Sequence, residues 1–472
     1  MKALVWFRRD LRINDNKALH FAAEKAGELQ AVYVVSREQW RMHNEAPAKI
    51  AFWKACLQSL ELRLAELGIS LHLLVADHYH DIPEAIASFA IQHKCSAVFF
   101  NREYEVNEIK RDELVTGKLK KAGINSLSFD DRVLLAPGSL LTGSGGFYTV
   151  FTPFKRSWLG LAARHDLKPL AAPAKRAAAI SIGTSATEKW QCEASWRSDL
   201  WPAGEQAALD RLHKFARQVM GHYHLQRDLP NVNGTSLLSP YLAAGVLSPR
   251  QCLQEALAAG NVFPPAGTGQ EVWLSELIWR DFYAHVLVGF PRVGRSQPFK
   301  LQTKALKWVD DQEQFEKWQA GETGFPVVDA AMRQLRQTGW MHNRLRMVTA
   351  MFLSKYLFID WREGEKYFIQ TLLDGDLAAN NGGWQWSAST GTDAVPYFRI
   401  FNPFSQSLRF DPDGSFIRKF CPEISSLPTA ALHDPKKLAA EVLARKLQYP
   451  PMMIDPRFAR SRVMAAFKAL GT

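Results

Sequence analysis

A predicted helix over residues 273–283 carries four side chains suited to holding a flat, polar ring. Glu276, Trp279, Arg280 and Tyr283 are spaced i, i+3, i+4 and i+7, so they share one face of a helix. A base extracted from a nucleic-acid duplex needs aromatic surface beside hydrogen-bonding groups, and this face offers both. A core helix with a Glu–Arg pair on its edge explains the same spacing, so both interpretations stay open.

A second predicted helix places Trp340, Asn343 and Met347 on one face. A buried amide on an otherwise apolar face must find hydrogen-bond partners, which favours a binding role for Asn343. Arg346 is close enough to this face to reach a carboxylate on a neighbouring segment. His342 is interpreted as a core or surface histidine and not as a catalytic one.

Hydroxyl side chains follow a glycine in the stretch over residues 233–242, which reads Asn-Gly-Thr-Ser-Leu-Leu-Ser-Pro-Tyr-Leu. Hydroxyls and backbone N–H groups at the start of a helix can bind an anion. An ordinary helix cap produces the same pattern, so the sequence does not separate the two.

Two carboxylates, Asp374 and Asp376, flank Gly375 in a predicted tight turn. The Asn-Asn-Gly-Gly run over residues 380–383 then allows a bulky group to approach the backbone closely. Paired carboxylates suggest a metal, but no His or Cys lies nearby, and an ion pair with Arg346 explains one of them equally well. No metal site is therefore predicted.

Indole side chains are dense around this stretch. Trp384 and Trp386 follow the glycines directly, and Trp308 and Trp361 lie earlier in the same half of the chain. Buried aromatic rings usually fill cores. Indole is also readily oxidised, so neighbouring rings can relay an electron, and spacing alone does not decide between the two roles.

The elements that must position these residues change character along the chain. Residues 1–130 alternate short apolar runs (3–7, 30–35, 71–75 and 97–100) with helical patterns, which predicts an α/β domain with a Rossmann-like parallel sheet. No Gly-x-Gly-x-x-Gly follows a strand, so a phosphate-binding loop is not predicted there. Residues 131–200 are interpreted as a linker, and residues 201–472 as a larger all-α domain.

The overall composition limits the classes of function. The 472 residues carry a formal charge of +11, which suggests a polyanionic partner, although a basic protein without one is the alternative. Five separated cysteines without a Cys-x-x-Cys pair argue against structural zinc and disulfides and fit a reducing cytosol. No apolar segment approaches the roughly 20 residues needed to cross a bilayer.

Taken in order, the motifs resemble those of the photolyase/cryptochrome family, and within it the bacterial class I cyclobutane pyrimidine dimer photolyases. The resemblance covers essentially the whole chain. It rests on residues 5–12 (Val-Trp-Phe-Arg-Arg-Asp-Leu-Arg), 151–154, 235–242, 276–283, 339–347 and 374–403.

The resemblance implies that the helical domain binds FAD in a folded conformation. The family positions that bind FAD correspond here to eleven residues: Tyr223, Thr235, Ser236, Leu237, Leu238, Ser239, Arg346, Asp374, Gly375, Asp376 and Asn380. Asp374 is expected to pair with Arg346. Asn380 is expected to face N5 of the isoalloxazine, where an amide stabilises a protonated nitrogen and an acid would titrate against it. Leu237 departs from the family, whose members carry a more polar residue there.

The resemblance also implies light-driven repair of a dimer flipped out of the DNA. Its catalytic positions are Glu276, Asn343, Met347 and Asn380, and its lesion and DNA contacts are Glu276, Trp279, Arg280, Tyr283, Asn343, Arg344, Trp386 and Gln406. Glu276 is expected to be a protonated acid that stabilises the radical anion of the dimer. Trp384, Trp361 and Trp308, in outward order, match the family's chain for photoreducing oxidised flavin.

A light-harvesting second chromophore is expected in the N-terminal domain. The positions that hold 5,10-methenyltetrahydrofolate in the family are His43, Asn44, Asn107, Glu108 and Arg295 here. Arg295 replaces the more familiar Lys, which leaves a deazaflavin or an empty site as alternatives.

Cryptochromes and (6-4) photolyases are the alternatives within the family. Against a cryptochrome, we expect no long polar signalling tail after Pro403, and Asn380 differs from the acid or thiol often found opposite N5. A (6-4) photolyase uses a His-rich lesion pocket. The comparable positions here hold Asn343 and Met347, which argues against that activity. We expect a cytoplasmic monomer that associates with the nucleoid through DNA and needs neither a membrane nor an obligate protein partner.

Overall fold

The computed structural model describes residues 1–176, 180, 185–257 and 262–471. They form two compact units, each built from separate stretches of the chain. The first unit contains Met1–Gly221, Ser236–Pro291 and Leu373–Ala378, and the second contains His222–Thr235, Arg292–Leu372 and Ala379–Thr472. Within the predicted linker over residues 131–200, positions 177–179 and 181–184 lie outside the described residues.

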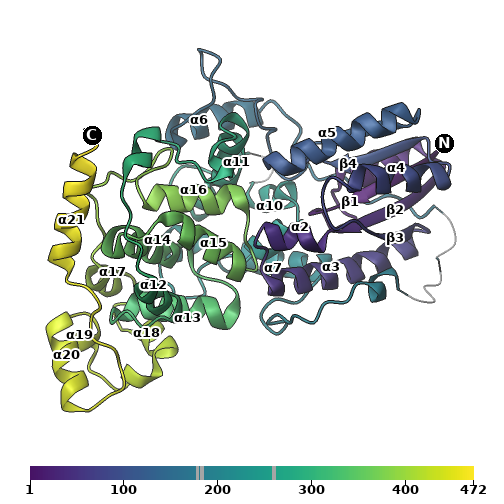
Figure 1. Ribbon diagram of the computed structural model, residues 1–472. Helices are drawn as coiled ribbons and strands as arrows, with labels where there is room; N and C mark the ends of the chain where they lie inside the picture. Colours follow the sequence, from purple (N-terminus) through teal and green to yellow (C-terminus); the bar gives the residue numbers. More distant parts are fainter. Residues whose placement is uncertain (177–179, 181–184, 258–261, 472) are drawn as a thin grey trace. The chain divides into compact units, whose positions relative to one another are not determined.

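A parallel sheet forms the centre of the first unit (Figure 1). Its strands are β1 (Lys2–Phe7), β2 (Glu28–Val35), β3 (Ser70–Val75), β4 (Ala97–Asn101) and β5 (Asn125–Phe129), in the order β3-β2-β1-β4-β5. The four apolar runs of the sequence fall in β1 to β4, so the predicted α/β fold is confirmed. The edge strand β5 was not predicted, because its sequence Asn-Ser-Leu-Ser-Phe lacks a continuous apolar run.

Helices cover both faces of this sheet, which explains why the central strands are apolar on both sides. The crossovers α1 (Lys17–Lys25) and α3 (Pro47–Glu66) serve the strands on one side of β1, whereas α4 (Ile82–Gln92) and α5 (Val106–Lys121) serve those on the other. Because such crossovers are right-handed, the two pairs lie on opposite faces. The α4 and α5 side chains form one buried cluster with Trp6 and Phe100.

Helices complete the first unit beyond the sheet. They include α6 (Phe151–Ala162), α7 (Glu205–Gln218), α9 (Ser239–Ala244), α10 (Pro249–Ala256) and α11 (Gly269–Gly289). The helix predicted over residues 273–283 lies within α11, which begins four residues earlier. The side chain of Thr268 caps its start by accepting a hydrogen bond from the backbone N–H of Glu271.

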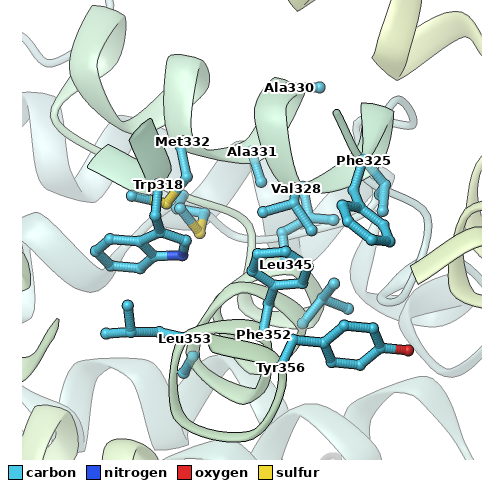
Figure 2. Packing of buried hydrophobic residues seen from close by; sticks show 14 of the residues in the cluster. Trp318, Phe325, Val328, Ala330, Ala331, Met332, Leu345, Phe352, Leu353 and Tyr356 are labelled. Atoms are coloured by element: carbon cyan, nitrogen blue, oxygen red, sulfur yellow. The ribbon is translucent and has the colours of Figure 1, made fainter. Parts of the chain in front are cut away.

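The second unit is helical, as predicted for this part of the chain. Its main helices are α12 (Gln312–Ala320), α13 (Pro326–Thr338), α14 (Asn343–Met351), α15 (Trp361–Thr371), α16 (Leu377–Ser387, whose first two residues belong to the first unit), α17 (Pro403–Phe410), α18 (Ser415–Phe420), α20 (Pro435–Ala444) and α21 (Pro456–Lys468). Trp318, Phe325, Met332, Leu345 and Phe352 converge in its core (Figure 2). A π-helical turn, Phe352–Leu357, follows α14.

His342 has a structural role in this unit. Its ring Nδ1 accepts a hydrogen bond from the backbone N–H of Arg344 at 3.2 Å and thereby caps α14. The helix therefore begins at Asn343, whereas the sequence pattern placed its start at Trp340. Burial lowers the pKa of His342 to about 4, so the ring is neutral at pH 7 and suited to accepting this bond.

Candidate functional site

Helix α11 carries the aromatic face predicted from its spacing. The Trp279 ring stacks on Phe151 with centroids 3.6 Å apart and planes 5° apart, and Tyr283 stacks at 5.5 Å and 30°. Phe151, which the sequence analysis placed in a family motif without assigning it a role, therefore fixes the plane of the indole and covers one of its faces. Glu276 is half-buried on the same helix.

Arg280 makes its contacts inside the first unit. Its Nη1 donates a hydrogen bond to the backbone carbonyl of Arg132, and its Nη2 lies 3.5 Å from the carbonyl oxygen of Leu242. Burial lowers the pKa of this guanidinium. The structure thus gives Arg280 a role in orienting α11, and a contact with DNA stays a prediction.

Asp281, which sequence reasoning missed, anchors the other side of α11. Its carboxylate accepts hydrogen bonds from the backbone N–H groups of Leu134 and Leu135 and from Nε1 of Trp158, at 2.9–3.2 Å. Only 1% of Asp281 is exposed, and burial raises its pKa to about 6. The sequence offered one indication of this role. Asp281 follows Arg280 directly and lies on the apolar face of the helix, opposite the face that carries Glu276 and Trp279.

The turn that contains Asp374, Gly375 and Asp376 also belongs to the first unit. Nζ of Lys49 donates a hydrogen bond to the Gly375 carbonyl oxygen at 2.7 Å. Nη2 of Arg132 pairs with Oδ2 of Asp376 at 2.8 Å. Neither cation was identified from the sequence, because both lie hundreds of positions before the turn.

The segment that leads into α9 has a backbone shape suited to an anion. Leu237 has a φ of +52°, in the left-handed region, and Leu238 follows with φ −95° and ψ −8°. Successive residues of this kind turn their N–H groups to one side and form an anion-binding concavity. Because backbone N–H groups would make such a contact, the unusual Leu at position 237 is compatible with a phosphate.

In the second unit, the orientation of the Asn380 amide is fixed. Nδ2 of Asn380 donates to the backbone carbonyl of Glu365 at 2.9 Å. A carbonyl can only accept, so the NH₂ end must face it and the Oδ1 end remains available to a donor. Oδ1 has no hydrogen-bond partner within the described ranges. The amide is thus prepared to accept a hydrogen bond from a protonated nitrogen.

Glu365 is an acid that the sequence analysis missed. Its side chain accepts a hydrogen bond from Nδ2 of Asn381 at 2.8 Å, and Oδ1 of Asn381 accepts one from Nε2 of Gln385 at 2.9 Å. Glu365 is 7% exposed, and burial raises its pKa to about 7. A buried acid therefore lies next to the amide run over residues 380–383.

The three tryptophans predicted to relay electrons differ in burial. Trp384 is 2% exposed and Trp361 is fully buried, and both belong to the core cluster of the second unit. Trp308 is partly exposed and packs against that cluster from its edge. The two rings predicted to be inner are thus both buried, and the ring predicted to be outermost is the one that is partly exposed. Trp386 is half-buried.

The remaining predicted contacts of the second unit lie on or near α14 and α17. Asn343 is exposed, Met347 is half-buried, and Nε of Arg346 donates to the Met341 carbonyl oxygen at 2.8 Å. Arg344 is held in two ways, since it pairs with Asp228 at 2.8 Å and lies over the ring of Phe410 at 4.4 Å. Tyr223 is buried and Gln406 is half-buried.

The predicted antenna residues of the first unit lie together. Nδ2 of Asn107 is 3.1 Å from Nε2 of His43, and Nδ1 of His43 is 3.7 Å from Oε1 of Glu108. Tyr79 also donates to Glu108 at 3.1 Å. Burial and the nearby Glu105 raise the pKa of Glu108 to about 7. Asn44 adjoins this group in a left-handed conformation, with φ +57°.

Arg295, the fifth antenna position, belongs to the second unit, where it is exposed. Its proposed contact with a chromophore stays a prediction.

These geometries fit FAD. The anion-binding backbone at residues 237–238 suits a diphosphate, and the fixed amide of Asn380 suits a flavin N5 that carries a proton. Over the described ranges, no group of three or more His, Cys, Asp or Glu is arranged to hold a metal ion. No helix in the described part of the chain is both long and apolar enough to span a membrane.

Comparison with known proteins gives a consistent result. Residues 3–174 match the family model described as DNA photolyase, and residues 273–469 match the model described as the FAD binding domain of DNA photolyase. A relative from Salmonella typhimurium named deoxyribodipyrimidine photo-lyase is 46% identical over 469 residues, covering 99% of this chain and 98% of its own length.

Solved structures agree with the sequence relatives. A bacterial class III photolyase from Agrobacterium tumefaciens superposes with a TM-score of 0.89 at 34% identity, covering 100% of this chain and 98% of its own. A cryptochrome from Synechocystis sp. PCC6803 superposes with a TM-score of 0.85 at 29% identity, covering 99% and 98% of the two chains. The architecture is thus shared by repair enzymes and a cryptochrome, and the residues of the site must distinguish them.

Proposed function

The chain belongs to the DNA photolyase family, and from this membership we infer that it is a deoxyribodipyrimidine photo-lyase that splits cyclobutane pyrimidine dimers in DNA with light. FAD, when bound, would supply the one-electron chemistry that opens the cyclobutane ring. The observation that carries the assignment is the similarity to relatives of this name over the full length of both chains.

The residues that the family resemblance assigns to FAD are proposed to bind it. The N–H groups around Leu237 and Leu238 hold the phosphates, and the hydroxyls of Thr235, Ser236 and Ser239 add donors at the same segment. Tyr223, Arg346 and the turn of Asp374, Gly375 and Asp376 complete the set. Asn380 accepts a hydrogen bond from N5 through Oδ1 and so holds a proton at that atom, which favours the reduced cofactor.

Glu276, Trp279 and Tyr283 of α11 are proposed to contact the lesion, and Asn343, Met347 and Trp386 are proposed as further lesion contacts. Because Phe151 covers one face of the Trp279 ring, a flipped dimer stacks on the other face. Glu276 donates a proton in a hydrogen bond to the dimer and stabilises the charge that develops on it. Arg280, Arg344 and Gln406 are proposed to contact the DNA around the lesion.

Trp384, Trp361 and Trp308 are proposed to carry an electron inward when the cofactor has become oxidised. Burial of the inner two rings keeps water from the path, and the partial exposure of Trp308 lets an external reductant restore it.

The second chromophore is proposed to be 5,10-methenyltetrahydrofolate. Nε2 of His43 faces two amide donors, Gln39 at 2.8 Å and Asn107 at 3.1 Å, so this nitrogen is the acceptor and the ring proton is on Nδ1, toward Glu108. An ionised Glu108 can accept two N–H bonds from a pterin-like ring. We further propose that the chain acts as a monomer in the cytoplasm.

The cryptochrome in the structural comparison supports a second candidate, a blue-light signalling receptor. The amide of Asn380 favours repair over signalling, because it does not titrate beside N5.

The deciding experiment is a light-dependent repair assay on the purified protein. Reduced protein is mixed with an oligonucleotide that contains one cyclobutane dimer, illuminated with blue light, and the dimer is quantified against a dark control. Loss of the dimer in light only is expected. A dimer that stays intact under light, in protein that contains reduced FAD, refutes the repair function and favours the receptor.

A further inference from the structure

The turn of Asp374, Gly375 and Asp376 is held by a buried lysine in the first unit. Lys49 lies on α3 and is 1% exposed. Its ammonium pairs with Glu45 on one side, donates to the Gly375 carbonyl oxygen at 2.7 Å on another, and lies 5.1 Å from the centre of the Trp53 ring. An ammonium ion loses hydration when buried, so its position requires these partners.

Arg132 holds the other end of the same turn. Its Nη2 pairs with Asp376 at 2.8 Å, while its Nη1 lies 3.3 Å from both carboxylate oxygens of Glu105. Glu105 in turn pairs with Arg9 at 2.5 Å, and Arg9 pairs with Glu103 at 2.6 Å. At least 85% of each of these side chains is buried, so Arg132 is fixed by a chain of ion pairs that begins at the sheet.

Burying these two cations costs more free energy than a role in packing alone would require. Apolar side chains of similar volume would fill the same space without the desolvation of two cations. Instead, both cations contact the turn. Lys49 binds the carbonyl oxygen of Gly375, and Arg132 binds the carboxylate of Asp376. Gly375 has no side chain that could restrict the turn, so these two contacts help to define its conformation.

We propose that Lys49 and Arg132 are positioning residues for FAD, which hold the turn of Asp374, Gly375 and Asp376 in the conformation that binds the cofactor. The inference rests on the proposed function, which assigns both aspartates to FAD. Arg132 has an electrostatic effect in addition, because it compensates the charge of Asp376 beside a cofactor that becomes more negative on reduction.

The test compares FAD release and flavin midpoint potential in holoenzyme variants. Lys49→Met keeps the apolar stem and removes the donor to Gly375. Lys54→Met, on the same helix and half-buried, is the matched control. FAD dissociation is followed by the fluorescence of the released cofactor, and we expect Lys49→Met to weaken binding at least about fivefold, the lower range of coupling between two sites. Lys49→Arg, which retains a cationic donor, is expected to restore most of the affinity.

The electrostatic role of Arg132 is tested by measuring the flavin midpoint potential. Arg132→Met should lower the flavin midpoint potential, since the charge of Asp376 then lacks this cation. The double variant Arg132→Met/Asp376→Asn should return it toward the wild-type value. A role in stability alone predicts no such recovery. This pair of variants also decides the proposal if Lys49→Met does not fold.

Two results overturn the proposal. One is equal FAD affinity in Lys49→Met and Lys54→Met, and the other is a midpoint potential that Arg132→Met leaves unchanged. Wild-type protein that binds no FAD would instead refute the proposed function itself, so the two failures are distinguishable.

Discussion

Gly364 on α15 allows a close approach between two helices at the predicted electron relay. A Cβ atom at this position would lie 2.1 Å from Cη2 and 2.5 Å from Cζ3 of Trp384, and 2.6 Å from Cδ2 of Leu353. Carbon atoms in contact are normally about 3.5–4.0 Å apart. In Gly364→Ala the buried indole must therefore move by at least about 1 Å.

The expected stability change combines two opposing effects. Overpacking a buried site costs about 1–3 kcal/mol, whereas replacing Gly by Ala inside a helix gains about 1 kcal/mol. We expect Gly364→Ala to lower the free energy of unfolding by up to about 2 kcal/mol in total. Gly117→Ala is the control, because Gly117 is an exposed residue of α5 whose added Cβ would meet no atom within 4 Å. It should raise the free energy of unfolding.

Urea unfolding of both variants measures this difference, and blue-light photoreduction of oxidised FAD measures the displacement of Trp384. We expect slower photoreduction in Gly364→Ala and an unchanged rate in Gly117→Ala. If the two variants have the same stability and the same rate, then the indole moves without cost, and the reasoning from its fixed position is wrong.

Three further predictions concern other parts of the site. Trp308→Phe should slow photoreduction of oxidised FAD and leave dimer repair by reduced protein unchanged; an equal loss of both would exclude the relay role. Glu365 has a pKa of about 7 in the folded protein against 4.5 normally, so its stabilising contribution is present below about pH 4.5 and is lost as the pH rises through 7. Wild type should thus lose about 3 kcal/mol relative to Glu365→Gln over that interval, measured by urea unfolding at both ends, and parallel profiles would contradict the buried acid. DNA affinity should fall at least about tenfold between about 50 and 200 mM salt, and a salt-independent affinity would count against phosphate contacts.

The sequence was most informative where function depends on residues close together in the chain. The spacing of Trp279 and Tyr283 predicted their shared face, and the apolar runs predicted four of the five strands. The parallel sheet and the helical remainder followed from these patterns. The edge strand β5 was missed because half-exposed strands lack a continuous apolar signal.

The residues that hold the site in place were not predictable in this way. Lys49 and Arg132 act across separations of 326 and 244 residues, and Phe151 reaches Trp279 from another helix. Glu365 looks like an ordinary surface acid in an amphipathic helix until the structure places Asn381 beside it. Only tertiary contacts reveal such partners, because no local periodicity encodes them.

The long separation between Arg132 and Asp376 has a consequence for biosynthesis. Ribosomes add about 5–20 residues per second, so the 244 residues between the two take about 10–50 s to be made. Throughout that time, Lys49 and Arg132 can pair with Glu45 and Glu105, but their partners in the turn, Gly375 and Asp376, do not yet exist. The first unit is complete only when the segment Leu373–Ala378 has been made, so the contacts of Lys49 and Arg132 with the turn form late in synthesis.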